Sequence, residues 1–179
     1  MERVGIFLKG MYRDILTAGD GRVLYDSGWT ANTIVDRCRI LLAGLMKNES
    51  STSGIQFLAV GQGLEDWDDT TGPPPSDPAT TTTDLVTRYN PPIPVNRLSL
   101  AYLDENAAVV VNPTNRLQIT ATLEPGYPPP LASLNTYPLR EFGLFGNFEG
   151  NDYMINNIRH PVIHKDAATT LVRVIRLYF

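Results

Sequence analysis

The stretch that decides the fold is residues 139–179, LREFGLFGNFEGNDYMINNIRHPVIHKDAATTLVRVIRLYF. Phe142, Leu144 and Phe148 alternate with small or polar residues, which is the period-two pattern of a half-buried strand. The chain then closes on LVRVIRLYF, a run rich in β-branched and aromatic side chains. Because a free terminus frays unless a sheet holds it, we expect this last strand to lie inside a sheet that forms the core.

Other segments carry strand patterns of the same kind. A turn over residues 146–152 leads into a return strand marked by Tyr153, Ile155 and Ile158. Residues 55–61, IQFLAVG, are apolar at nearly every position, which predicts a strand covered on both faces. The remaining expected strands are residues 4–8 paired with 22–26, residues 97–103 paired with 107–111, and the alternating run 116–123.

One helix is predicted, over about residues 32–47. Thr30 or Asn32 is placed to cap its first turn. Gly44 inside the helix marks a close crossing against the sheet, because glycine otherwise weakens a helix. An apolar face recurs at three- and four-residue spacing and consists of Ile34, Cys38, Leu41, Leu42 and Leu45.

Two long proline-rich loops interrupt these elements, at about residues 62–83 and 124–138. The first includes PPP and TTTT runs, which cannot build a core and predict a surface loop with polyproline character. No repeat or domain boundary is evident. We therefore expect residues 1–179 to form a single mainly β (α+β) domain. It is predicted to be antiparallel and β-sandwich-like, with one packed amphipathic helix and long proline-rich loops.

Composition limits the function. The 179 residues are 42% apolar and 19% charged, with a net charge of −4, and a mildly acidic chain does not suit sequence-independent nucleic-acid binding. A single cysteine, Cys38, allows no internal disulfide and no cysteine-based zinc site. No stretch approaches the roughly 20 apolar residues of a membrane span, and we expect no signal peptide. The chain is expected to be made and folded in the cytosol, with no membrane insertion.

Few residues offer chemistry. His160 and His164 are four apart, but Pro161 between them argues against a helix, so we interpret both as structural or surface histidines. The acidic cluster at residues 65–69 matches no calcium loop, so we interpret it as solvated or ordered by a basic neighbour. No nucleophile elbow or phosphate loop is present. We therefore predict no catalytic residue, no cofactor-binding residue and no metal ligand.

Four aromatic residues fall in or beside the proline-rich loops: Trp67, Tyr89, Tyr127 and Tyr137. Aromatic side chains on such loops can stack on sugar rings or anchor a protein interface. They can equally fix the loops onto their own domain. Both interpretations stand at this point, and these four residues form the candidate interface.

The order of features resembles structural proteins of tailed-phage and contractile-injection tails, in the baseplate and tail-fibre region. The resemblance rests on four features: Gly28 and Trp29 ahead of the helix, a strand ending in AVGQG at residues 59–63, the threonine- and proline-rich loop, and the run REFGLF at residues 140–145 before an alternating last strand. The resemblance implies a non-enzymatic assembly role and transfers no catalytic residue.

The expected function is therefore a structural subunit of a phage tail or tail-like particle. Its partners would be other tail, baseplate or fibre proteins and further copies of itself, and its location the virion or tail-like particle after synthesis in the host cytoplasm. The alternative is a carbohydrate-binding β-sandwich that recognises host surface glycans through the loop aromatics.

Overall fold

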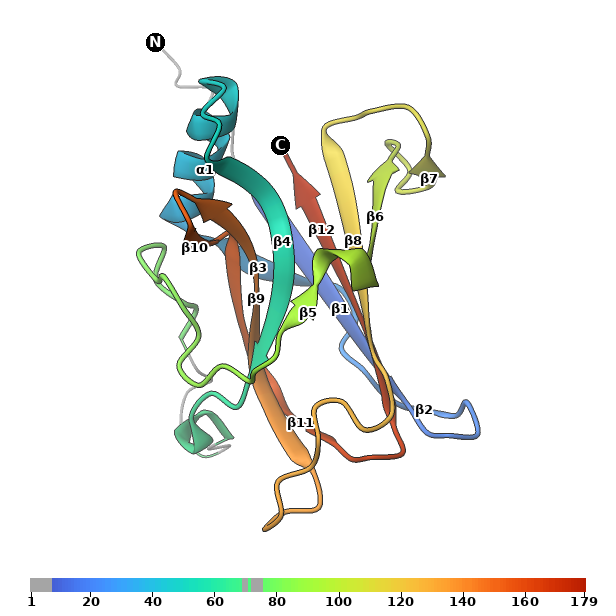
Figure 1. Ribbon diagram of the computed structural model, residues 1–179. Helices are drawn as coiled ribbons and strands as arrows, with labels where there is room; N and C mark the ends of the chain where they lie inside the picture. Colours follow the sequence, from blue (N-terminus) through green and yellow to red (C-terminus); the bar gives the residue numbers. More distant parts are fainter. Residues whose placement is uncertain (1–7, 69–70, 72–75) are drawn as a thin grey trace.

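A computed structural model gives the structure of the chain and describes residues 8–68, 71 and 76–179 (Figure 1). The fold is mostly β: of the described residues, 49% are in strands and 11% are helical, and the antiparallel sheet is curled. One α-helix is present in the described part of the chain. The predicted fold class, a mainly β and sandwich-like domain with one helix, is confirmed.

The strands join into one 12-stranded sheet in the order β5-β4-β9-β11-β3-β1-β12-β8-β6-β7, with β10 beside β9 and β2 beside β1. The elements are β1 (Lys9–Thr17), β2 (Val23–Asp26), β3 (Thr30–Ile34), α1 (Asp36–Met46), β4 (Thr52–Gly61), η1 (Glu65–Asp68), β5 (Ile93–Pro94), η2 (Val95–Arg97), β6 (Leu98–Leu103), β7 (Val109–Val110), β8 (Arg116–Leu123), β9 (Tyr137–Phe148), β10 (Asn151–Met154), β11 (Asn156–Lys165) and β12 (Thr170–Tyr178).

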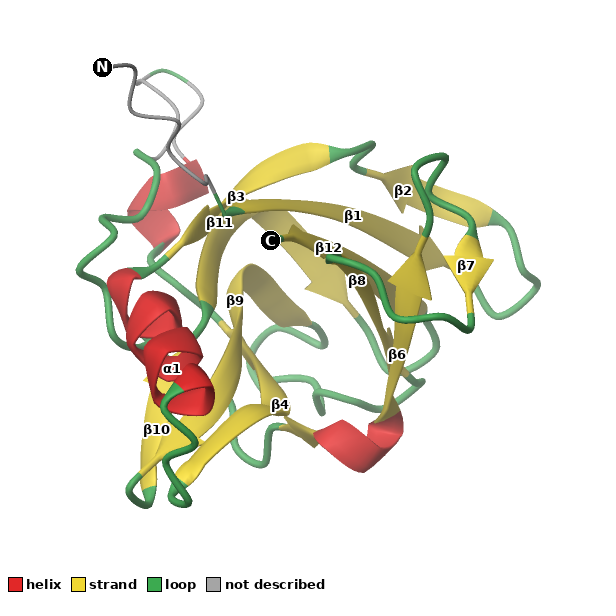
Figure 2. Cartoon of the chain, turned by 90° about the horizontal axis from the view of Figure 1, so that it is seen from above, coloured by secondary structure: helices red, strands yellow, loops and turns green. Residues whose placement is uncertain are grey.

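The sheet curls upon itself so that β4 and β6, near its two ends, come to face each other (Figure 2). The core fills the inside of this curl. Tyr12, Ile119, Phe142 and Ile175 are all buried there, from strands distributed around the whole sheet. Helix α1 packs beside β4, β9 and β10.

The last strand lies inside the sheet, as the sequence predicts. β12 pairs with β8 on one side and with β1 on the other, from Lys9 opposite Tyr178 to Thr17 opposite Thr170. Leu171, Arg173, Ile175 and Leu177 point inward and are buried. The two ends of the described chain are therefore neighbours in one antiparallel ladder.

β9 is more central than its sequence pattern predicts. The prediction of a half-buried strand is wrong, because Tyr137 to Gly146 are buried without interruption and β9 pairs with β4, β10 and β11. The turn expected over residues 146–152 is shorter than predicted, because β9 continues to Phe148. The loop predicted at residues 124–138 likewise ends early, because Tyr137 and Pro138 already belong to β9.

The helix begins four residues later than predicted. Residues 30–34 form β3, where Thr30 pairs with Tyr12 of β1 and Ile34 with Asn156 of β11, and these ladders prevent the helix from starting earlier. The expected caps, Thr30 and Asn32, therefore do not cap it; Val35 precedes α1 and makes no side-chain cap bond. The close crossing at Gly44 is confirmed, because a Cβ there would lie 2.8 Å from the Thr52 hydroxyl.

The N-terminal pairing also differs from the prediction. β2 pairs with β1, for example Leu16 with Tyr25, and residues 4–7 of the strand expected as its partner lie outside the described residues. The sequence pattern of β1 is hard to recognise because its buried positions include Asp14 between Tyr12 and Leu16.

Asp14 is buried because it pairs with Arg173, directly opposite it on β12. Arg173 Nε and Nη2 each donate to one Asp14 oxygen at 2.8 Å, and both side chains are fully buried. The guanidinium also lies 3.6 Å from the centre of the Phe142 ring on β9. On β11, His160 Nε2 accepts from Arg173 Nη2 at 3.0 Å, while Nδ1 donates to the Pro161 carbonyl at 2.7 Å. The histidine is therefore the neutral Nδ1–H tautomer.

Removal of Asp14 is expected to destabilise the fold severely. Asp14→Ala leaves the buried Arg173 charge without its counter-ion, which costs about 3–5 kcal/mol in the free energy of unfolding. Chemical denaturation measures it. Arg13→Ala is the matched control, because the neighbouring Arg13–Asp26 pair is partly exposed, and its loss is expected to shift the midpoint far less. Equal shifts for both variants would contradict the structural role given to the buried pair.

Stability is expected to fall as the pH decreases from about 6.5 to about 4. Burial, and next the charge of Arg173, lower the pKa of His160 from 6.5 to about 4, so in this window only the unfolded chain takes up the proton. The unfolded state then binds more protons, and the free energy of unfolding falls by up to about 1.4 kcal/mol per pH unit. Across this range, the denaturation midpoint should change less with pH in His160→Gln than in the unsubstituted protein. In the exposed control His164→Gln, the pH dependence of the midpoint should be unchanged.

Candidate functional site

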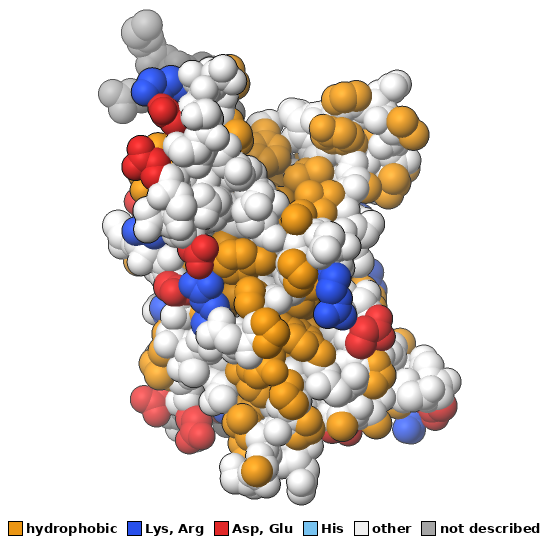
Figure 3. All heavy atoms as spheres, viewed as in Figure 1, with side chains coloured by type: hydrophobic (Ala, Val, Ile, Leu, Met, Phe, Trp, Pro, Cys, Tyr) orange, Lys and Arg blue, Asp and Glu red, His pale blue; other side chains and the backbone are white. Residues whose placement is uncertain are grey.

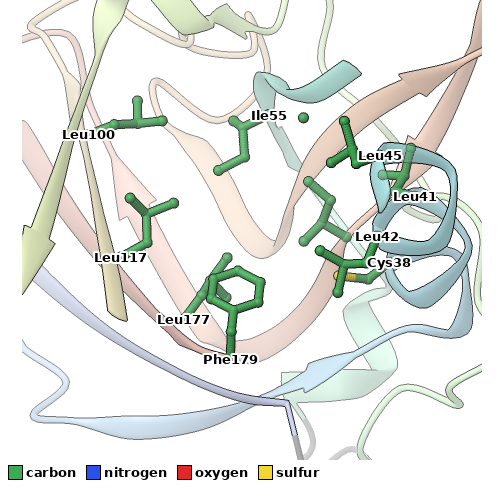
Figure 4. Close-up of a pocket in the computed structure, with 11 residues that line it drawn as sticks. Cys38, Leu41, Leu42, Leu45, Ile55, Leu100, Leu117, Leu177 and Phe179 are labelled. Carbon is green, nitrogen blue, oxygen red and sulfur yellow. The ribbon is translucent and has the colours of Figure 1, made fainter. Parts of the chain in front are cut away.

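An apolar cleft of about 190 Å³ opens where the chain ends (Figure 4). Helix α1 forms one wall and the ends of β6, β8 and β12 form the other, with β4 between them. The lining residues are Cys38, Leu41, Leu42 and Leu45 of α1, Gly54 and Ile55 of β4, Leu100, Leu117, Ile155, Leu177 and Phe179.

Regular structure places these side chains. Cys38, Leu41, Leu42 and Leu45 follow helical spacing and share one side of α1. Across the cleft, Leu117 of β8 lies directly opposite Leu177 of β12, so both point to the same side of the sheet. The cleft is thus held by two rigid walls rather than by loops.

The chemistry of the cleft is that of hydrocarbon. None of the lining side chains is charged, and their only heteroatom is the sulfur of Cys38. Burial raises the pKa of the Cys38 thiol to about 11, so it stays protonated at neutral pH and is no nucleophile. The volume is below the roughly 300–1,000 Å³ of small-molecule sites, and a cavity of about 150 Å³ holds a benzene-sized group. The cleft therefore suits one or two apolar side chains.

The cleft lies in a seam, which we define as the gap between residues 54–56 of β4 and residues 98–101 of β6. Within the described residues, no strand pairs with either segment on the side that faces the gap. The space-filling view shows a notch between the α1 side and the β6–β7 side of the molecule, with hydrophobic side chains on its floor (Figure 3). The sheet is therefore almost a barrel, but it remains open at this end.

Three of the four predicted interface residues pack against one another, away from the cleft. The Tyr89 ring meets Tyr127 at 5.5 Å and Tyr137 at 5.3 Å between centroids, edge to face in both contacts. Tyr137 is 2% exposed, and the Tyr127 hydroxyl donates to the Pro91 carbonyl at 2.9 Å. These contacts fix the 124–138 loop and the segment that contains Tyr89 to the sheet, which is the structural interpretation of these tyrosines.

Trp67 lies apart from this tyrosine cluster, half-buried on η1. The Arg159 guanidinium lies 4.8 Å from the Trp67 ring centre. In the acidic cluster, Asp68 is bound by Arg140 of β9 with contacts down to 2.6 Å, so the basic neighbour comes from the same chain. Asp69 lies outside the described residues, and those residues contain no group of three acidic, histidine or cysteine side chains that could hold a metal ion.

The run at residues 140–145 that carries the resemblance to tail proteins organises the long loop. Beside Arg140, the buried Glu141 carboxylate accepts from the amides of Gly63, Val86 and Thr87 at 3.2, 3.0 and 2.9 Å. Both ends of the loop predicted at residues 62–83 are therefore held by β9.

The two histidines are not brought together as ligands. His160 is buried against Arg173, whereas His164 is exposed and lies 3.5 Å from the Thr136 hydroxyl. Lys165 beside it is buried and donates to the Glu124 and Thr169 carbonyls, and burial lowers its pKa to about 8. These groups fasten turns to the sheet.

The sequence does not reveal the cleft. Helical spacing places Leu42 and Leu45 on the apolar face of the helix, and the strand patterns account for Leu100 and Leu117 only as strand residues. Leu45 is nevertheless 45% exposed and Leu100 42% exposed. The available signal was the excess of apolar residues near the end of the helix, because Met46 extends that face and is 88% exposed.

Comparison of the chain with protein-family models, curated proteins and solved structures gave no significant match to any of them. Among the described residues, no helix is long and apolar enough to cross a membrane.

Glu141→Gln is expected to loosen the long loop. The amide keeps the shape but offers one acceptor oxygen to three backbone donors, so a buried N–H loses its partner at a cost of about 1–3 kcal/mol. Limited proteolysis between residues 62 and 87 should accelerate, with the exposed Glu105→Gln as the control. Unchanged cleavage would show that Glu141 does not hold the loop.

Proposed function

We propose that this protein is a non-enzymatic structural subunit of a phage tail or phage-tail-like particle, in the baseplate or tail-fibre region. The observation that carries the proposal is the apolar cleft in the seam, which is lined by uncharged side chains and bordered by the unpaired edge of β6. Such a recess provides no acid, base or nucleophile for catalysis. It does provide what one protein uses to hold another, namely apolar surface next to a free strand edge.

The resemblance to tail proteins supports the specific assignment. One run that carries the resemblance, residues 140–145, lies in the buried part of β9. Within it, Arg140 and Glu141 hold the long loop, and Phe142 packs against Arg173. These roles give a physical reason for a structural family to use this run.

The proposal includes partners and location. The chain assembles with itself and with other tail, baseplate or fibre proteins, and it resides in the virion or tail-like particle after synthesis in the host cytoplasm. Its acidic charge of −4 is consistent with protein partners rather than nucleic acid.

The alternative, recognition of host glycans, gains no support from a described contact. Sugar binding by loop aromatics needs open ring faces. The tyrosine cluster instead uses its rings for internal edge-to-face contacts, and Arg159 lies over the Trp67 ring.

Sedimentation of a lysate from the native source tests the proposed function. The chain is expected to co-sediment in fixed stoichiometry with tail-like particles, identified by mass spectrometry and by negative-stain microscopy of the same fraction. Deletion of its gene should yield particles that lack baseplates or fibres. Particles that sediment normally without the chain, together with glycan binding that is lost in Trp67→Ala, would instead establish the alternative.

A further inference from the structure

The two edges of the seam differ in how well their main-chain groups are satisfied. On β4, the side-chain amide of Gln56 donates to the Gly54 and Ile55 carbonyls at 3.3 and 3.2 Å. On β6, β7 pairs only with Tyr102 and Leu103. The Leu98 amide donates to the Val95 carbonyl of η2, and no described strand pairs with residues 98–101 on that side. The free edge is therefore that of β6.

The chain already places a strand at the narrow end of the seam. β5 pairs antiparallel with β4 through Phe57 opposite Pro94 and Leu58 opposite Ile93. After Pro94 the chain turns away through η2 and enters β6 (Figure 2). At one end of the gap between β4 and β6, β5 therefore lies beside β4 as an extended strand. Farther along the gap, between residues 54–56 and residues 98–101, the described residues place no strand.

The cleft supplies binding sites for the side chains of such a backbone. Leu45, Leu100 and Phe179 line it and are 45%, 42% and 39% exposed, respectively. In β6, Leu98, Leu100 and Tyr102 stand opposite Ala121, Ile119 and Leu117 of β8, so these alternate residues face the inside of the curl. A strand added beside β6 would point every second side chain toward the same cleft.

We propose that the seam binds an extended segment of a neighbouring protein chain, which adds to the free edge of β6 and inserts apolar side chains, spaced two residues apart, into the cleft. Main-chain hydrogen bonds to residues 98–101 fix its backbone, and the hydrocarbon lining selects its side chains. This inference rests on the proposed function, because a neighbouring chain of the assembly would supply the segment. It adds how that neighbouring chain is bound.

The observations favour this occupant over others. A free small molecule would leave the β6 edge unpaired, and the cleft offers no polar side chain to orient it. A helix would satisfy its own main-chain groups and would not use the strand edge. An extended segment with alternating apolar residues matches both features.

Hydrogen exchange of the full-length protein tests the proposal without requiring the particle. The probe is a pool of short peptides with Val, Ile, Leu or Phe at every second position and Ser, Thr or Lys between them. Bound peptides are expected to slow amide exchange within residues 98–101. Leu100→Asp should weaken binding about tenfold or more, because a buried leucine contact is replaced by a charge. Leu134→Asp is the matched control, because Leu134 is similarly exposed, at 49%, on a loop away from the cleft.

A second peptide set separates strand addition from simple apolar contact. Amides of alternate residues point to the same edge of a strand. One set of peptides is N-methylated at the apolar residues and the other at the intervening residues. Because only one of the two groups of amides points toward β6, strand addition predicts that one set loses binding.

Three results of the peptide experiments would overturn the proposal: no slowing of exchange within residues 98–101 by any peptide of the pool, full binding of both methylated sets, or equal effects of Leu100→Asp and Leu134→Asp. Faster exchange of these amides in the free protein after deletion of residues 1–7 would also overturn it, because the chain itself would then fill the seam. These results are independent of co-sedimentation, so a protein that joins particles without binding strands retains the proposed function and loses only this inference.

Discussion

The ion pair between Asp14 and Arg173 is the interaction on which the rest of the fold depends. It joins the first and last strands of the described sheet at directly opposed positions, inside a core where an uncompensated charge is costly. Arg173 extends this link across the curl, because its guanidinium also contacts Phe142 on β9 and His160 on β11. One buried side chain therefore contacts three other strands, the N-terminal β1 and the C-terminal β9 and β11, and links the two ends of the described chain inside the core.

The same arrangement explains why the molecule has an open end. Pairing around β1, β12 and β9 closes most of the curl, but the strands at its two ends are too short to complete it: β5 and β7 have two residues each. In the closed part, the side chains of Glu141, Arg140 and Lys165 hydrogen-bond to main-chain groups of the loops. At the seam, apolar surface and the edge of β6 stay uncovered among the described residues, which is where a structural subunit would receive a partner.

Much of the fold follows from the sequence, but the site does not. The alternation in residues 116–123 and the apolar end of the chain predict β8 and β12, because side-chain period reports burial directly. β1 was not recognised as a strand, and Arg173 not as a buried residue, because each charge makes the other's burial possible and only the register reveals the pair. The tyrosine cluster and the cleft likewise arise from contacts between distant segments. A leucine such as Leu100 has the same local pattern whether the space opposite it is filled or open.

A structure of this protein together with its neighbours, isolated from the native source, tests the account most directly. The account predicts an extended backbone from another chain beside β6, with apolar side chains in contact with Leu45, Leu100 and Phe179. A complex in which the neighbours contact other faces and the seam holds only solvent would contradict it.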